Sequence, residues 1–159
     1  MSQSAQRALE ILTRQIGVEE LPGEYLRIDQ DRINAFAETT LDRQFIHVDP
    51  VRAAETPFQS TIAHGFLSLS LITHLCESIP PLDPDPFAER VMGINYGLER
   101  VRFTAPVKVN SRVRARRVLL AAELKGDHAI QMTHRVTVEV EGDRKPACVA
   151  DWITRAVYA

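Results

Sequence analysis

The 159-residue chain is poor in cysteine. It has only Cys76 and Cys148, which lie 72 positions apart and form no CxxC pair. Cysteine-based metal sites and disulfide scaffolds need more cysteines, or closer ones. The histidines likewise show no short ligand spacing. We therefore expect two reduced, buried thiols and no metal ion.

Long apolar runs are also absent. The most apolar stretch, residues 62–75, is interrupted by Ser68, Ser70 and Thr73, and a membrane span needs roughly 20 mostly apolar residues. The first seven residues, MSQSAQR, lack the apolar region of a secretory signal. These absences predict a cytoplasmic protein with no membrane partner.

A strong charge of one sign is missing too. The chain has 19 basic and 21 acidic residues, a formal net charge of −2, which argues against a nucleic-acid partner. With 45% hydrophobic residues it is not disordered. Neither a glycine-rich phosphate loop nor a GxSxG motif is present, so nucleotide binding and serine hydrolysis have no support. The length predicts a single domain, residues 1–159.

The N-terminal half predicts helices. Residues 3–16 have amphipathic spacing, so residues 1–20 are expected to form a helical extension. A short strand over 25–28 precedes a helix that begins near Asp31. Residues 41–63 lack sustained periodicity and predict a long connection with one helical turn at 50–55; long ordered loops are often functional.

Residues 65–79 predict a helix of another kind. Apolar side chains point in nearly every direction around it, and such a helix is normally buried. Because one helix cannot bury itself, a sheet is expected to wrap it.

The C-terminal half predicts four strands, 92–103, 109–124, 128–140 and 147–157. The clearest alternation places Met132, Val136, Val138 and Val140 on one face. Short turns near 126 and 142 imply antiparallel neighbours. We therefore predict an α+β hot-dog fold, a curved antiparallel sheet around a long central helix, although other α+β layouts also place a helix on a sheet.

Asp42 and His47 lie five residues apart in the long connection, where a loop can bring both side chains to one point. A carboxylate and an imidazole together can hold a water molecule and move its protons. The alternative is that Asp42 caps a turn and His47 is a core histidine.

His64 and Gly65 stand directly before the apolar helix. Unpaired backbone N–H groups there can hold a developing oxyanion, and glycine permits close approach. The alternative is that Gly65 only allows a tight entry into the helix.

Together, Asp42-x4-His47-x-Asp49 and the segment Ile62-Ala63-His64-Gly65-Phe66 resemble the signature of the MaoC-like dehydratases, which include the (R)-specific enoyl-CoA hydratases. The similarity extends over about residues 25–157, through the stretches at 94–107 and 145–150.

This resemblance implies a hot-dog homodimer, or an oligomer of dimers, that hydrates trans-2-enoyl-CoA to (R)-3-hydroxyacyl-CoA without a cofactor. Asp42 and His47 would be catalytic, and the Gly65 N–H would form the oxyanion hole. The substrate-binding residues would be Gln44, Phe45, Ile62, Ala63, His64 and Arg102.

One position departs from the family. Many members have glycine just before the catalytic aspartate, where this chain has Leu41. Glycine there could serve a positive φ or leave room near the acyl chain, and both explanations stay open.

Seven basic residues lie between Arg100 and Arg117. They either meet the phosphates of coenzyme A or form a solvated strand face, and Arg102 is the expected contributor. Two other functions stay open: an acyl-CoA thioesterase, and a non-catalytic subunit of a hydratase heterodimer.

Overall fold

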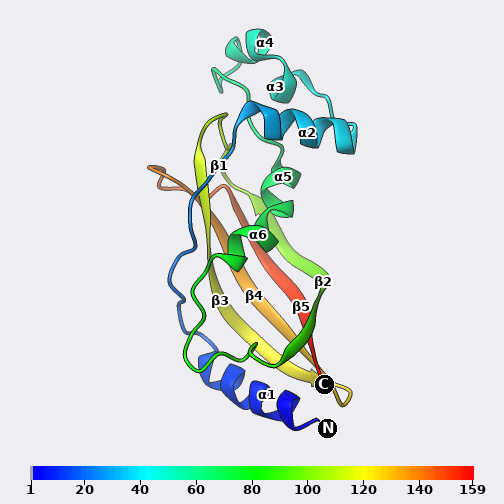
Figure 1. The fold of residues 1–159 in the computed structure, drawn as a ribbon. Coiled ribbons are helices and arrows are strands. Elements are labelled where there is room, and N and C mark those ends of the chain that lie inside the picture. Colours follow the sequence, from blue (N-terminus) through cyan, green and yellow to red (C-terminus); the bar gives the residue numbers. More distant parts are fainter. Residues whose placement is uncertain (1) are drawn as a thin grey trace.

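A five-stranded antiparallel sheet dominates the computed structural model, which describes residues 2–159 (Figure 1). The strands run in the order β1-β3-β4-β5-β2, so β2 pairs with the last strand of the chain. The sheet curls around two short helices, which is the hot-dog arrangement expected from the sequence. The strands are β1 Leu26–Arg27, β2 Arg90–Phe103, β3 Arg112–Lys125, β4 Ala129–Val140 and β5 Cys148–Tyr158.

The alternation expected in the third long strand is confirmed by β4. Met132, Val136, Val138 and Val140 are buried on the concave face, whereas the residues of opposite parity are half-buried or exposed. His134 has the same parity as the valines and is buried with them, which makes it a polar group inside the curl of the sheet.

The central helix differs from the expectation. It is two pieces, α5 (Gly65–Ser70) and α6 (Ile72–Glu77), joined at Leu71. The Leu71 N–H donates to the Leu67 carbonyl and the Leu75 N–H donates to that of Leu71, so the helix continues through the join. The prediction that the sheet encloses the helix on every side is wrong for the single chain, because Phe66 at the start of α5 is 66% exposed. The sheet covers only one side.

The core lies between this helix and the sheet. Leu67, Ile72 and Leu75 pack against Val113, Val136 and other apolar residues of the concave face. A second cluster lies where α1 (Gln3–Gln15) packs against the sheet, near both chain termini in Figure 1. The predicted N-terminal helical segment is thus packed on the sheet through Ala5, Ala8 and Leu12.

Three helices lie beyond the other end of the sheet: α2 (Gln30–Thr40), α3 (Phe45–Val48) and α4 (Pro50–Ala54) (Figure 1). The side chain of Asp29 caps α2, and that of Asp49 caps α4. The turn expected at 50–55 is α4. The four-residue α3 went unpredicted, because one turn is too short to show a period. These helices form the wall of the candidate site.

The edge strand β2 is exposed along almost its whole length. Its large apolar side chains reach solvent, and they are Val91, Met92, Ile94, Tyr96, Leu98 and Phe103. Among the described residues, no helix is long and apolar enough to span a membrane.

Candidate active site

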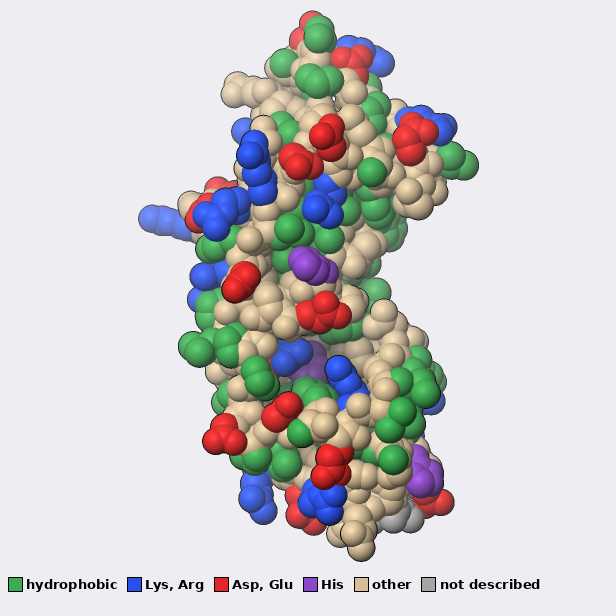
Figure 2. All heavy atoms as spheres, viewed as in Figure 1, with side chains coloured by type: hydrophobic (Ala, Val, Ile, Leu, Met, Phe, Trp, Pro, Cys, Tyr) green, Lys and Arg blue, Asp and Glu red, His purple; other side chains and the backbone are tan. Residues whose placement is uncertain are grey.

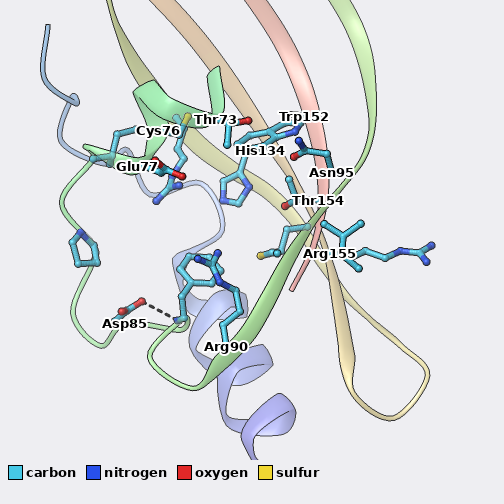
Figure 3. A pocket seen from close by; sticks show the side chains of 17 residues that line it. Thr73, Cys76, Glu77, Asp85, Arg90, Asn95, His134, Trp152, Thr154 and Arg155 are labelled. Atoms are coloured by element: carbon cyan, nitrogen blue, oxygen red, sulfur yellow. Dashed lines mark hydrogen bonds between the residues drawn. The ribbon is translucent and has the colours of Figure 1, made fainter. Parts of the chain in front are cut away.

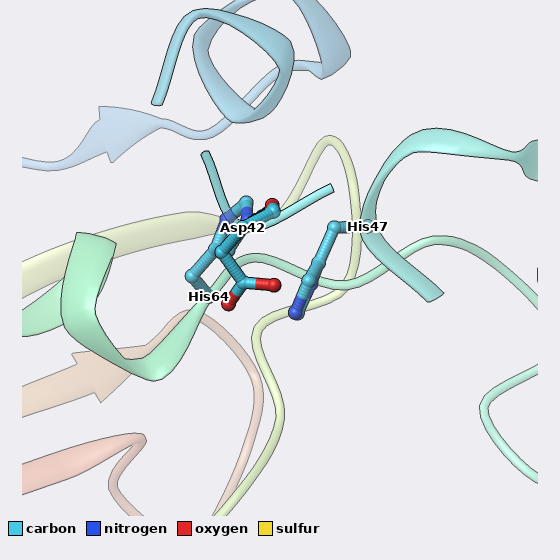
Figure 4. Close-up of side chains that lie close together, drawn as sticks. All are labelled: Asp42, His47 and His64. Carbon is cyan, nitrogen blue, oxygen red and sulfur yellow. Dashed lines mark hydrogen bonds between the residues drawn. The ribbon is translucent and has the colours of Figure 1, made fainter. Parts of the chain in front are cut away.

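Three polar side chains from different parts of the chain converge at the start of α5 (Figure 4). Asp42 lies in the connection after α2, His47 lies in α3, and His64 is the residue directly before α5. A carboxylate oxygen and one nitrogen of each imidazole all lie within 4.8 Å of one another. The two residues separated by five positions therefore do meet at one point.

Leu41 sets the direction of the Asp42 backbone. It ends α2 in the left-handed region, with φ 65° and ψ 13°. Its side chain is 69% exposed and is not among the residues that line the cavity described below. Of the two explanations for glycine at this position, the positive φ is the one that this chain shows, and leucine adopts it at a cost of roughly 1–2 kcal/mol.

His47 is held in one tautomer. Its Nδ1 lies 2.7 Å from the Ile62 carbonyl oxygen. A carbonyl can only accept, so Nδ1 carries the hydrogen and Nε2 of the neutral ring keeps a lone pair. Burial is the main reason that the pKa of His47 lies below its ordinary value, and the Ile62 hydrogen bond and Asp42 oppose it. At neutral pH His47 is therefore a base whose free nitrogen faces a carboxylate.

His64 contacts both other members of this cluster. Its Nε2 lies 2.9 Å from the Asp42 carbonyl oxygen and therefore donates to it. Its Nδ1 is buried without a hydrogen-bond partner among residues 2–159. The ring stacks on His47, with centroids 3.8 Å apart and planes 24° apart. His64 thus ties the loop that carries Asp42 to the start of α5.

The same three groups satisfy the distances of a metal site. A metal ion needs lone pairs that converge on one point at about 2.0–2.1 Å from each nitrogen. The in-plane lone pairs of two nearly parallel, stacked rings run side by side instead. A water molecule between Asp42 and His47 fits this arrangement better.

Sequence reasoning missed a network behind the site. The Gln30 amide donates to the His47 carbonyl at 2.8 Å, and the Thr61 hydroxyl donates to the Gln30 carbonyl oxygen. Gln30 therefore joins α2, α3 and the segment before α5. Its position in the first turn of a helix gave no sign of this, because both partners are distant in the sequence.

A cavity of about 300 Å³ opens beside the cluster. His47, Ile62, Ala63 and Gly65 line it, together with Ser68 and Phe103. A Cβ atom on Gly65 would lie only 2.9 Å from the Phe103 ring, so this close approach requires glycine. No described residue accepts a hydrogen bond from the Gly65 N–H.

The other residues assigned to substrate lie at the margin. Gln44 precedes α3 and is exposed, and Phe45 is half-buried beneath the Arg52 guanidinium, whose carbon lies 4.2 Å from the ring centroid. Arg102 is exposed, donates to the Val101 carbonyl and does not line this cavity. The structure thus brings Ile62, Ala63 and His64 to the cluster, but not Arg102.

The basic residues of β3 are mostly neutralised. Arg114 and Arg116 pair with Glu139, and Arg117 pairs with Glu20 through two hydrogen bonds of 2.6 and 2.7 Å. The predicted basic segment is therefore largely a balanced strand face and offers few free cations for a phosphate.

Several known proteins resemble this chain in sequence or in fold. The family model described as MaoC like domain matches residues 13–142. Nodulation protein N of Rhizobium leguminosarum bv. viciae is 49% identical over 140 residues, which cover 87% of this chain and 84% of that one. The 3-hydroxyacyl-thioester dehydratase Z of Mycobacterium tuberculosis is 48% identical over 134 residues, which cover 84% and 85% of the two chains.

One solved structure resembles this chain in both fold and sequence. The unliganded R-hydratase PhaJ1 of Pseudomonas aeruginosa superposes with a TM-score of 0.62 at 25% identity. The superposition covers 89% of each chain.

Proposed function

This chain belongs to the MaoC-like dehydratase family, and we propose that it adds water reversibly to trans-2-enoyl-CoA to give (R)-3-hydroxyacyl-CoA. The observation that carries the proposal is the position of His47: its Nδ1 is held by the Ile62 carbonyl, and its outer nitrogen points to the Asp42 carboxylate (Figure 4). A water molecule between them has an acceptor for each of its hydrogens.

The proposed reaction uses both groups as acid–base catalysts. His47 and Asp42 draw a proton from the water as its oxygen bonds to Cβ, and the proton is returned to Cα. The hydroxyl group and the hydrogen that appear in the product therefore both come from that water. Positioned acid–base catalysis of this kind contributes about 10²–10⁴-fold.

Negative charge develops on the thioester oxygen during this addition. The Gly65 N–H has no partner among the described residues, and Gly65 lines the same cavity as His47. A carbonyl oxygen at this N–H would be stabilised as it becomes enolate-like, and one such donor is worth about 2.7–4 kcal/mol. The R configuration of the product is proposed from the R-hydratase relative.

We further propose that the working unit is a homodimer joined along β2. This strand ends the sheet, so one row of its backbone groups is unpaired, and its apolar side chains are exposed beside the uncovered side of α5. A second copy would cover both. Light scattering on the purified chain should give twice the monomer mass, and a monomer at micromolar concentration would contradict this part.

The test of the activity is hydration of crotonyl-CoA and longer trans-2-enoyl-CoAs, with the product's configuration determined by chiral chromatography. We expect R product from the wild type and almost none from Asp42→Asn, whose fold is checked by circular dichroism. Near-normal hydration by Asp42→Asn would overturn the mechanism. Release of free thiol without hydration would indicate a thioesterase. A folded wild type with neither activity would indicate a non-catalytic subunit.

A further inference from the structure

The largest cavity described, about 500 Å³, is lined by Thr73, Cys76 and Glu77 of α6 (Figure 3). In Figure 1, α6 lies at the other end of the central helix from α3, which carries His47. The cavity is lined by residues of α6, β2, β3, β4, β5 and the loop before β2. In Figure 2 this face is hollowed below its middle, and basic and histidine side chains lie within the hollow. Its lining includes the neutral hydrogen-bonding side chains of Thr73, Asn95, His134, Trp152 and Thr154, and we name it the His134 chamber.

His134 is the unusual member. Its side chain is only 5% exposed, lines the chamber, and makes no hydrogen bond with any of residues 2–159. Buried polar groups nearly always have a partner, so a partner from outside the chain is expected. Burial, followed by the positive charge of Arg117, lowers the pKa of His134 to about 3. The ring is therefore neutral, with one nitrogen that donates and one that accepts.

The charges around the chamber cancel. Arg90, Arg117 and Arg155 line it, and so do Glu77 and Asp85. Arg117 is further held by Glu20 from outside the lining. With three cations against three carboxylates, the chamber offers no excess positive charge for an anion. A neutral group with a hydrogen-bonding oxygen is the better complement.

A second cavity extends from the chamber along the central helix as far as α5. A neighbouring cavity of about 340 Å³ is lined by Leu69, Ile72 and Leu98, and it shares Thr73, Asn95 and Trp152 with the chamber. From Gly65 to Cys76 the helix advances roughly 16 Å at 1.5 Å per residue. An acyl chain of about that length, with its thioester at Gly65 and lying along α5 and α6, would end beside His134.

We propose that the His134 chamber binds a neutral oxygen-bearing group, such as a hydroxyl, at the far end of the acyl chain. The enzyme then prefers enoyl thioesters with an oxygenated tail over plain alkyl ones of the same length. This inference rests on the proposed hydratase function. An apolar pocket would have the opposite preference, because it leaves a buried hydroxyl unpaired.

The test compares pairs of trans-2-enoyl-CoAs with equal numbers of chain atoms, one ending in a hydroxyl and one in a methyl group. At the length that reaches the chamber, we expect kcat/KM of the wild type to favour the hydroxyl about tenfold, the value of one net hydrogen bond. A terminal carboxylate of that length should be a poorer substrate than the hydroxyl.

Variants assign the preference to His134. His134→Phe should abolish the hydroxyl-to-methyl preference, whereas His134→Gln, which keeps a donor and an acceptor, should retain most of it. His128→Phe, at an exposed position beside the β3–β4 turn, is the matched control. If His134→Phe does not fold by circular dichroism, Thr154→Val, which removes a hydroxyl from the lining on β5, should lower the same preference.

The outcomes separate the two proposals. Hydration of all substrates with methyl favoured at every length, or with carboxylate favoured over hydroxyl, would overturn the chamber proposal and leave the proposed function standing. Hydration of none by a folded wild type would overturn the proposed function, and the chamber proposal with it.

Discussion

Two buried histidines lie at opposite ends of the central helix, and they differ in how the fold treats their nitrogens. His47 has a carbonyl on Nδ1 and a carboxylate near Nε2. The side chain of His134 has no hydrogen-bond partner among the described residues. Burial lowers the pKa of both. The comparison shows that burial keeps an imidazole neutral. The hydrogen-bond partners of its two nitrogens then determine whether the ring is oriented to act as a base or keeps both nitrogens available to a ligand.

The largest expected effect is on the base. His47→Gln should lower kcat for enoyl-CoA hydration by about 10²–10⁴-fold, because the free Nε2 lone pair is lost. The free energy of unfolding, measured in urea, should change much less. His128→Gln is the control and should keep the wild-type rate. A near wild-type kcat in His47→Gln would contradict the assignment of His47 as the catalytic base and, with it, the difference drawn between His47 and His134.

The second effect is a loss of folding stability at acidic pH, which we attribute to His134. Its pKa is about 3 in the folded state against 6.5 for an ordinary histidine, so the unfolded chain binds the proton first as the pH falls. Stability that is fully present above pH 6.5 is therefore lost progressively towards pH 3, at up to about 1.4 kcal/mol per pH unit.

Urea unfolding of the wild type and of His134→Phe between pH 6.5 and pH 4 measures this. Over that range the wild type should lose about 3 kcal/mol more than the variant. Equal pH dependence in both would mean that His134 is not held neutral by the fold.

A third, smaller effect concerns the cavity next to His47. In Gly65→Ala the new methyl group would meet the Phe103 ring at 2.9 Å, and such overpacking costs roughly 1–3 kcal/mol. We expect a lower melting temperature and a lower kcat, since the backbone N–H moves with the ring. The double variant with Phe103→Leu should recover part of both. If Gly65→Ala behaves like the wild type, the Gly65 backbone is not positioned by Phe103.

The smallest effect is expected at Leu41. Leu41→Gly relieves a positive φ but also frees the unfolded chain, so the unfolding free energy should rise by less than about 1 kcal/mol. Because the turn is retained, the position of Asp42 should not change, and kcat should stay at the wild-type value. Leu41→Val should instead destabilise, since a β-branched residue tolerates this conformation poorly. A Leu41→Gly enzyme with lost activity would show that the leucine side chain itself serves the site.

Much of the site could be predicted from local sequence. The motif that contains Asp42, His47, His64 and Gly65 named the residues that the fold brings to one point. Arg102 was expected to meet the coenzyme A phosphates, and its exposed side chain lies outside the cavity, because a strand position alone does not say which way a side chain faces a ligand. Gln30 escaped notice because its partners, the His47 carbonyl and the Thr61 hydroxyl, lie 17 and 31 residues away.

The sequence pattern itself contains a signal for the buried His134. It falls between Met132 and Val136 with the parity of the buried valines, so the alternation alone places a polar ring inside the sheet. What alternation cannot reveal is that the ring has no partner, because hydrogen bonds across a cavity depend on several strands and a helix at once.

By itself, the sequence determined the strands, the turns between them and the residue types of the site, because these follow from side-chain period and local backbone preference. Only the tertiary structure decided that β2 pairs with β5 and remains an open edge, and that α5 is covered on one side alone. It also decided which nitrogen of His47 is free. Those features are set by contacts between segments far apart in the chain, where packing and hydrogen bonding, rather than local preference, determine the outcome.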